Sequence, residues 1–554
     1  NTLVDSGDVT AILEPFGSTI NIGVSGWATL SVTPSVAGYT SLRATSVSPT
    51  PASSSTVCLN TTTNLTDCSL LVLACASGGF ACLENGVNSS WDATARKPLY
   101  TKLVNTNFIV DIVALKSNGK LETNYVAIGG IAKAVMFELV DGTGDDTCID
   151  RTAIGPSISQ TLSFSDSDLG RKTASMRVTE AYTNLRCRLT DINQVPAAVN
   201  CSTDSFAVRP LGFTVNSSNA NADNNGQNTT ASPEIKAGIS FNLTADSSTV
   251  GYNGTPLIDT SAVEAHSGAS INGALSGEFN AADTASGIAS GSRFTYSDVG
   301  YFRMGAHALT DSSFTMVDQS DNDCTDDFSN TLNGGKYGCK ITNIANTSYF
   351  GRFYPDHFDV VVAPGCNTGG FTYSAQPFTV MVTAKNGFVR STITSNYDGS
   401  TLPNFAQTVT FSDINNVAEG FLSPTIINAN AFSMGVANPI PAFTFNNVAT
   451  APIIIKLHAV DTDYVSSSGY ESEATNTIRS GRIRLLNAYG SEILDLPMTM
   501  RAEYWQNATN GWQTNTADTC TDATLSFSAI LPTDITSNTC VLDTGSSSGN
   551  SSKG

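Results

Sequence analysis

Three segments of the chain place apolar residues at every second position, which is the pattern of a β-strand with one buried face. They are residues 108–114, 239–245 and 378–384. Each is followed by a tyrosine and then a glycine: Tyr125 and Gly129, Tyr252 and Gly254, Tyr397 and Gly399. The spacing from strand to tyrosine varies, whereas a solenoid repeat has a constant period. The pattern therefore predicts a shared hairpin theme in separate domains, with each tyrosine where a strand enters a turn.

Further strand-like runs lie between turn signals, and helical periodicity is almost absent. These runs are 28–32, 135–140, 174–178, 314–317, 408–411, 453–458, 482–486 and 498–504. In the last of them Arg501 and Glu503 alternate with Met500, Ala502 and Tyr504, as expected of a strand with one buried face. The prediction is an all-β protein of tandem immunoglobulin-like β-sandwich domains with disulfides.

A length of 554 residues exceeds one compact core and predicts several domains. The expected division is a Ser/Thr/Cys-rich β segment over 1–95 that we do not place in a fold, and sandwiches over 96–207, 208–350 and 351–480. A C-terminal β region with a flexible tail follows over 481–554. The chain opens at Asn1 without a signal-peptide pattern, which predicts a processed chain or a fragment.

Charge and hydropathy exclude several partners. Charged residues make up only 14% of the chain, and 48 acidic residues against 28 basic ones give a net charge of -20. This balance argues against a nucleic-acid partner and against polybasic docking on anionic lipid. The most apolar stretch, 126–140, is interrupted by Lys133 and Glu138, so no membrane span is predicted.

Cysteine usage favours an oxidising compartment, because the twelve cysteines form no CxxC motif and suit disulfide-closed loops. Close spacing favours the pairs Cys58 with Cys68, Cys75 with Cys82, Cys324 with Cys339, and Cys520 with Cys540. Cys148 with Cys187 is a candidate staple of one domain, and Cys201 and Cys366 are left over. Spacing by itself does not settle the connectivity.

Several phrases in the second half of the chain occur in a distinctive order. They are GRFYPDHF at 351–358, FTYSAQPF at 371–378, SNYDG at 395–399, GRIRLLNAYGSE at 481–492, RAEYW at 501–505, and the segment 515–521. This order resembles the domain of unknown function in MSHA-pilus biogenesis proteins of the Q type and in related large bacterial surface proteins. The resemblance covers roughly residues 97–545. It implies an extracellular, Gram-negative, type IV pilus-associated protein of structural or adhesive type. It implies no known catalytic activity, and it suggests pilins as partners.

An acidic cluster and two tryptophans are the candidate binding residues. Asp318, Asp321 and Asp323 precede Cys324, and carboxylates in loops between extracellular domains are calcium ligands. The alternative is a solvated acidic loop beside a disulfide. Trp505 and Trp512 could stack on a sugar or pack within a β-domain.

The dipeptide Asp356-His357 is a candidate acid/base pair. As neighbours on a strand the two side chains should point to opposite faces, and no nucleophile motif accompanies them. We therefore expect a non-enzymatic protein without a cofactor, calcium being the one metal hypothesis.

The predicted function is an extracellular structural or adhesive component of a type IV, MSHA-like pilus or surface filament of a Gram-negative bacterium. Its expected partners are pilins, other filament subunits or further copies of this chain. A glycan-binding adhesin module on the cell surface is the alternative.

Overall fold

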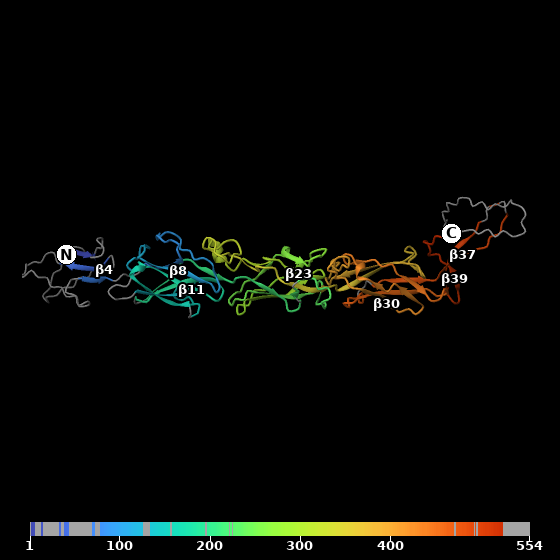
Figure 1. Cartoon of the computed structure of the whole chain (residues 1–554), viewed down its shortest axis with the longest axis horizontal. Coiled ribbons are helices and arrows are strands. Elements are labelled where there is room, and N and C mark those ends of the chain that lie inside the picture. The colour runs from blue at the N-terminus through green and yellow to red at the C-terminus, as the bar shows by residue number, and fades with distance from the viewer. Residues whose placement is uncertain are drawn as a thin grey trace, which may run out of the picture.

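The computed structural model describes residues 78–524 apart from 126–132, 156–157, 194–196, 221, 224, 470–472, 492–493 and 495–496. Within the first 77 residues it describes only five short strands, β1 (Thr2–Asp5), β2 (Leu13–Glu14), β3 (Thr33–Pro34), β4 (Gly38–Arg43) and β5 (Ser69–Val72). The predicted strand at 28–32 lies outside the described residues. Figure 1 shows β8, β23 and β30 in successive bodies along one long axis.

The first sandwich packs a three-stranded sheet on a larger one. The smaller sheet has the order β11 (Arg171–Arg177), β8 (Asn107–Leu115), β6 (Gly79–Glu84). The larger contains β10 (Gln160–Phe164), β9 (Lys133–Asp141), β12 (Tyr182–Asp191), β14 (Phe206–Arg209) and β7 (Lys102–Leu103), with β13 (Ala198–Cys201) beside β12; the 3-10 turn η2 (Asp166–Asp168) precedes β11. Val110 and Ile112 of β8 share one core with Leu189 of β12, so the alternating residues of the first repeat form the sandwich interior.

The second sandwich uses three sheets. The first has the order β15 (Thr214–Asn216), β18 (Phe241–Asp246), β22 (Ile288–Tyr296), β21 (Leu275–Ser276). The second has the order β16 (Ala222–Asp223), β26 (Tyr349–Tyr354), β23 (Gly300–Met304), β20 (Val263–Ala265), and β17 (Ile235–Lys236) also pairs with β26. The third has the order β19 (Leu257–Ile258), β24 (Leu309–Asp311), β25 (Ile341–Thr342), and the 3-10 turn η3 spans Thr260–Ala262. The second repeat places Phe241, Leu243 and Ala245 in the core, but its first residue, Ile239, is 43% exposed. The alternation therefore starts two residues later than predicted.

The strand predicted at 314–317 is wrong. Its last residues begin α1 (Met316–Asp321), the single α-helix in the described part of the chain. Thr315 is the N-cap residue, and Phe314 is buried ahead of it. A four-residue apolar run carries too little periodicity to separate a buried helix start from a strand.

The third sandwich and a small terminal sheet complete the described chain. One sheet of the sandwich has the order β27 (His357–Ala363), β29 (Thr379–Lys385), β33 (Val436–Ala437). The larger sheet has the order β28 (Thr372–Tyr373), β36 (Thr475–Arg479), β35 (Ile453–Asp461), β30 (Val409–Asp413), β32 (Ile426–Ile427). A two-stranded sheet pairs β31 (Gly420–Ser423) with β34 (Ala442–Phe445), and the 3-10 turn η4 spans Ala429–Ala431. The terminal sheet has the order β37 (Gly481–Leu485), β38 (Met500–Asn507), β39 (Gly511–Thr514). The protein is thus an all-β array of immunoglobulin-like sandwiches, as predicted.

The repeated tyrosines lie in loops, and all three side chains are buried in the cores. Tyr252 donates to Asp311 over 2.7 Å, and Tyr397 donates to Asp461 over 2.8 Å. In the first sandwich Tyr125 accepts a longer contact of 3.4 Å from Asn193, which also donates to an aspartate. Each aspartate is the last residue of a strand (β12, β24 or β35) and accepts the backbone N–H two residues onward: Asp191, Asp311 and Asp461. The repeat therefore includes a polar core contact as well as a strand.

The first and second sandwiches are joined through a fully buried arginine. Arg209, at the end of β14, donates to the carbonyls of Gly338, Pro210 and Ser329. Burial lowers the pKa of Arg209 to about 10. Because two of the acceptors belong to the loop after α1, the side chain anchors the second sandwich to the first.

The second and third sandwiches share hydrophobic packing. Val299 and Tyr301 of the second sandwich belong to the same buried cluster as Phe405 of the third. Across the joint, Arg352 makes a two-pronged ion pair with Asp463, with both N–O distances at 2.7 Å. A shared core and a buried ion pair leave little room for bending at this joint.

Candidate functional site

The structure places four disulfides in the described residues. Cys324 is joined to Cys339, the pair that close spacing favours. The remaining bonds are Cys82–Cys187, Cys148–Cys201 and Cys366–Cys520, with sequence separations of 105, 53 and 154 residues. Cys58, Cys68, Cys75 and Cys540 lie outside the described residues.

The other pairings inferred from spacing are wrong for the cysteines that the structure describes: Cys75 with Cys82, Cys148 with Cys187, and Cys520 with Cys540. Cys201 and Cys366 are not left over. Cys82 lies on β6 and Cys187 on β12, so their bond joins the two sheets of the first sandwich. Sheet packing, which sequence distance does not reveal, decides which thiols meet.

The predicted calcium residues lie at the joint between the first two sandwiches. Asp321 and Asp323 gather with Asp204 around the guanidinium of Arg96, whose Nη2 lies 3.0 Å from Asp321 and 3.1 Å from Asp204. Asp323 is buried and also contacts Arg96. The calcium hypothesis stays a prediction, and Arg96 is the cation that the structure places among these carboxylates.

Asp318 points elsewhere. It is completely buried and accepts hydrogen bonds from Thr101 at 2.5 Å and from the backbone of Ala207 at 3.0 Å. Burial raises its pKa well above the usual range, more than these donors lower it. Asp318 therefore joins α1 to the first sandwich and is separate from the Arg96 group.

Asp356 and His357 contact each other, so the prediction that they point to opposite faces is wrong. His357 Nδ1 lies 2.9 Å from Asp356 Oδ2. Asp356 precedes β27, outside the regular strand, and its carboxylate also pairs with Lys236 of the second sandwich at 3.1 Å. The pair is part of a joint between domains.

His458 contacts a carboxylate and two serines. Its Nδ1 lies 2.6 Å from Glu473 and 3.2 Å from Ser467, and its Nε2 lies 3.5 Å from Ser466. The last distance is long for a hydrogen bond, and Ser466 Oγ accepts from the backbone of Ser468. This geometry stabilises a turn next to β35. That the protein is not an enzyme stays a prediction.

The terminal sheet is organised around one buried carboxylate. Glu503 of β38 is fully buried and faces Arg482 of β37 across the sheet. It accepts hydrogen bonds from Arg482 at 2.8 Å and from Arg501 at 2.7 Å, and Arg484 lies 3.7 Å away. Burial raises the pKa of Glu503, but the arginine hydrogen bonds outweigh it, and the pKa lies below its ordinary value.

The burial of β38 differs from the prediction. Met500 was expected on the buried face, yet it is exposed, while Glu503 on the opposite face is the most buried residue of the strand. In a three-stranded sheet with little apolar cover, the ion pairs with arginine compensate the burial of a carboxylate.

Trp505 and Trp512, predicted as a glycan-stacking pair, lie directly opposite each other on β38 and β39. Their ring centroids are 5.6 Å apart in an edge-to-face arrangement, and both residues are half-buried. The guanidinium of Arg482 lies 4.3 Å from the Trp512 ring centre. We call the surface formed by Arg482, Arg484, Arg501, Trp505 and Trp512 the arginine–tryptophan face.

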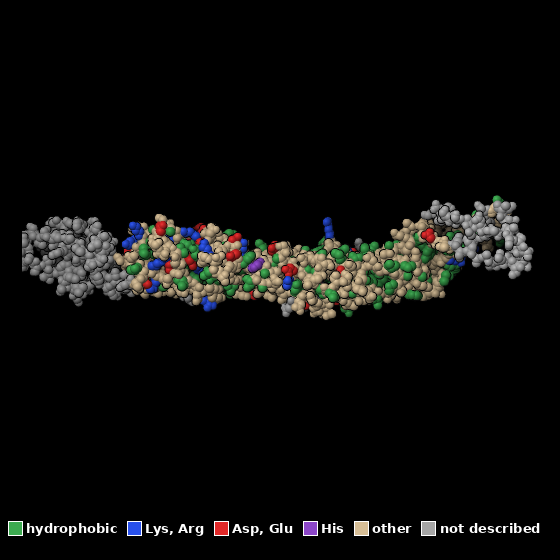
Figure 2. Space-filling model, turned by 45° about the horizontal axis from the view of Figure 1, so that its top comes forward, with side chains coloured by type: hydrophobic (Ala, Val, Ile, Leu, Met, Phe, Trp, Pro, Cys, Tyr) green, Lys and Arg blue, Asp and Glu red, His purple; other side chains and the backbone are tan. Residues whose placement is uncertain are grey.

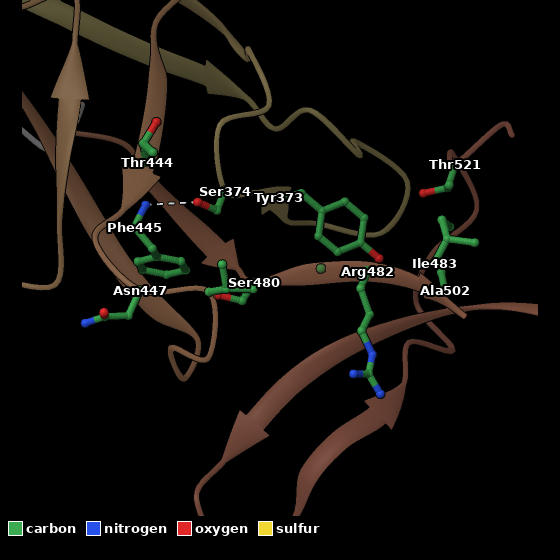
Figure 3. A pocket seen from close by; sticks show the side chains of 12 residues that line it. Tyr373, Ser374, Thr444, Phe445, Asn447, Ser480, Arg482, Ile483, Ala502 and Thr521 are labelled. Carbon is green, nitrogen blue, oxygen red and sulfur yellow. Dashed lines mark hydrogen bonds between the residues drawn. The ribbon is translucent and has the colours of Figure 1, made fainter. Parts of the chain in front are cut away.

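A cavity of about 430 Å³ opens between the third sandwich and the terminal sheet (Figure 3). Its lining includes Tyr373, Phe445, Ile483 and Ala502. Arg482 of β37 also lines the cavity, and in Figure 3 its side chain extends away from Tyr373. Arg482 thus borders both the cavity and the arginine–tryptophan face.

Tyr373 ties the two sides of this cavity together. Its hydroxyl donates to Asp518 over 2.9 Å and accepts from Asn515 over 2.6 Å. Burial raises the pKa of Tyr373 to about 12. Together with the Cys366–Cys520 bond, these contacts hold the terminal sheet on the third sandwich.

Sequence reasoning found the tryptophans and missed the arginines. The signal was present in the chain: Arg482 and Arg484 are two apart, as are Arg501 and Glu503, so each pair shares a strand face. The register between β37 and β38 places these two faces on the same side of the sheet, and this register is known only from the structure.

Models of two domains of the family DUF6701 match the chain, the third domain over residues 327–478 and the fourth over 479–554. The division between them lies where β36 ends and the terminal sheet begins. No curated protein matches the chain.

Solved structures resemble the chain at low identity. One is FdeC, an adhesin of Escherichia coli, with 12% identity and a TM-score of 0.24, covering 72% of this chain and 96% of that one. Another is the ICAM-5 D1–D4 ectodomain fragment, with 10% identity and a TM-score of 0.21, covering 74% of each chain. With TM-scores this low, neither carries an inference about function.

Among the described residues, no helix has the length and apolar character needed to cross a membrane.

Proposed function

We propose that this chain is an extracellular structural and adhesive component of a type IV, MSHA-like pilus or surface filament in a Gram-negative bacterium. The observation that carries the proposal is the packing at the joints between sandwiches. Val299 and Tyr301 continue the core of the next sandwich, and Arg209 bridges the preceding joint inside the protein. Packed joints suit a stalk that holds a binding surface away from the cell.

The disulfides support an extracellular location. Four bonds lie in the described residues, and two of them span more than 100 positions of sequence. Structural disulfides persist in oxidising compartments and are rare in the cytoplasm. The pilus association rests on the order of the sequence phrases between 351 and 521.

Exposed apolar side chains support an adhesive role. In Figure 2 hydrophobic side chains gather toward the end that carries the third sandwich, whereas charged side chains are frequent over the first. The third sandwich exposes the large residues Leu402, Phe421, Ile426 and Ile454. Exposed side chains of this kind supply apolar surface for contact with a partner.

Imaging the native bacterium tests the proposal. Antibodies against the third sandwich should label filaments on intact cells, and a deletion strain should lose the label. External protease should remove the protein from unbroken cells. Label confined to the cell interior would reject the surface assignment, and label on the cell body alone would reject the filament.

A glycan-binding adhesin is the second candidate, and the half-buried Trp505–Trp512 pair favours it.

A further inference from the structure

The terminal sheet concentrates positive charge on a strongly acidic protein. The strands β37 and β38 contain three arginines and one carboxylate, whereas the whole chain has a net charge of -20. The single carboxylate, Glu503, is fully buried, while the side chains of Arg482, Arg484 and Arg501 are 38%, 48% and 37% exposed. One buried carboxylate neutralises only part of this charge, so the exposed surface stays cationic.

Glu503 also orients the guanidinium groups. It accepts hydrogen bonds from the Nε of Arg482 and of Arg501, and the Nη2 of Arg482 lies 2.7 Å from the same carboxylate. Each guanidinium has further N–H donors beyond these contacts, and both side chains are more than a third exposed. Within the described part of the chain, Arg484 makes only the 3.7 Å contact with Glu503. An array of preoriented guanidiniums is suited to two-pronged binding of carboxylate or sulfate groups.

The aromatic rings lie on the same side of the sheet as these arginines. Register pairs Arg482 with Glu503, and Trp505 follows Glu503 by two residues, so both side chains point to that side. Trp512 is opposite Trp505. Half-buried indoles offer an apolar surface next to the cationic one.

We propose that the arginine–tryptophan face binds an acidic polysaccharide, with the arginines pairing its carboxylate or sulfate groups and an indole packing on the apolar face of a sugar ring. The proposal deepens the adhesive role proposed above and rests on it for its setting outside the cell.

Binding of the purified chain to immobilised polygalacturonate, heparin and neutral dextran tests the proposal. We expect binding to at least one acidic polymer and none to dextran, with affinity falling as salt screens the charges. A preference for polygalacturonate identifies carboxylate as the recognised group, and a preference for heparin identifies sulfate. Equal binding to dextran, or no binding to either acidic polymer, overturns the proposal.

Substitutions locate the site. Arg484→Gln should weaken binding about tenfold, because a charge-assisted hydrogen bond is lost. Arg390→Gln is the matched control, since Arg390 is an exposed arginine of the third sandwich, and it should leave binding unchanged. Trp512→Ala should also weaken binding, and Trp512→Phe should restore part of it. Thermal melts of each variant establish that the fold is intact.

Equal loss from Arg390→Gln and Arg484→Gln would overturn the site, because it would indicate a nonspecific charge effect. Sedimentation velocity tests whether an acidic surface of a second copy of the chain binds the arginine–tryptophan face instead. Self-association abolished by Arg484→Gln, without polysaccharide binding, would also overturn the proposal. These measurements use purified protein, so their failure leaves the filament assignment intact, and failure of the imaging experiment leaves the binding result intact.

Discussion

Buried tyrosine–aspartate contacts are the residue-level feature that the second and third sandwiches share. In the third sandwich, burial raises the pKa of Asp461 to about 6, and the hydroxyl of Tyr397 acts in the opposite direction by donating to the carboxylate. The contact ends β35 and fixes the turn that follows it. A core hydrogen bond of the same kind in the second and third sandwiches gives the recurring tyrosine a structural role.

Tyr397→Phe should destabilise the third sandwich by about 1–3 kcal/mol, because it leaves the buried carboxylate of Asp461 without this donor. Differential scanning calorimetry of the full chain measures the change. Tyr464→Phe is the control, since Tyr464 is 88% exposed, and it should leave the transition unchanged. An equal effect of the two substitutions would argue against the role assigned to the buried contact.

At the scale of elements, the joint between the second and third sandwiches contains groups that titrate in opposite directions. Burial lowers the pKa of His266, which packs edge-on against Phe405 at 4.5 Å, to about 4. Burial raises the pKa of Asp298, whose carboxylate accepts the backbone N–H groups of Ser395 and Asn396, to about 6. Both side chains belong to the second sandwich and contact the third.

His266 should make this joint less stable in acid. The unfolded chain binds a proton at its ordinary pKa near 6.5, and the folded protein only near 4, so stability is lost as pH falls through that window. Between pH 7 and pH 5 the loss from His266 is about 2 kcal/mol. Asp298 has the opposite sign, because its folded pKa is the higher one, and it gains stability as pH falls.

Comparing the wild type with His266→Gln isolates the histidine, since Asp298 is present in both proteins. The melting temperature of the variant should change less between pH 7 and pH 5 than that of the wild type. His307→Asn is the control: His307 is exposed, and its φ of 64° suits asparagine. If the melting temperature of His266→Gln changed with pH as much as that of the wild type, the proton would bind at a different group.

The Cys366–Cys520 disulfide links two distant elements of the fold. It joins the loop after β27 to the segment after β39, so it closes the terminal sheet onto the third sandwich. The double substitution Cys366→Ser and Cys520→Ser should speed proteolytic cleavage around residues 515–524 without altering the sandwich itself. Limited proteolysis read by mass spectrometry measures this. Removing Cys324 and Cys339 instead should leave that cleavage rate unchanged.

At the scale of the whole molecule, the sandwiches lie along one axis (Figure 1), and buried side chains cross their joints. Phe405 is 2% exposed and contacts His266 and Tyr301 of the preceding sandwich. Because interiors are close-packed, a joint of this kind has one preferred arrangement.

Phe405→Ala should loosen the second joint and broaden the distance distribution measured by small-angle X-ray scattering. The cavity left by a large buried ring removes the packing that aligns the two domains. Phe421→Ala, at a residue that is 56% exposed, should leave the distribution unchanged. Indistinguishable scattering from the two variants and the wild type would mean that other contacts suffice for alignment.

Local pattern determined much of the architecture. Alternation in residues 108–114 and 378–384 predicts strands and their buried faces, and these strands are β8 and β29. The all-β class follows from such patterns together with the near absence of helical periodicity, because side-chain direction along a strand depends only on neighbouring residues. A short run such as 314–317 is the exception, since it contains too few residues to show a period.

The tertiary structure alone decided which distant residues meet. Cys82 bonds Cys187 across two sheets, Arg96 lies among aspartates more than a hundred positions away, and Arg484 shares a face with Trp512. Each of these contacts depends on sheet order, register or domain packing. Such features arise from the free energy of burying whole surfaces together, so no local stretch of sequence encodes them.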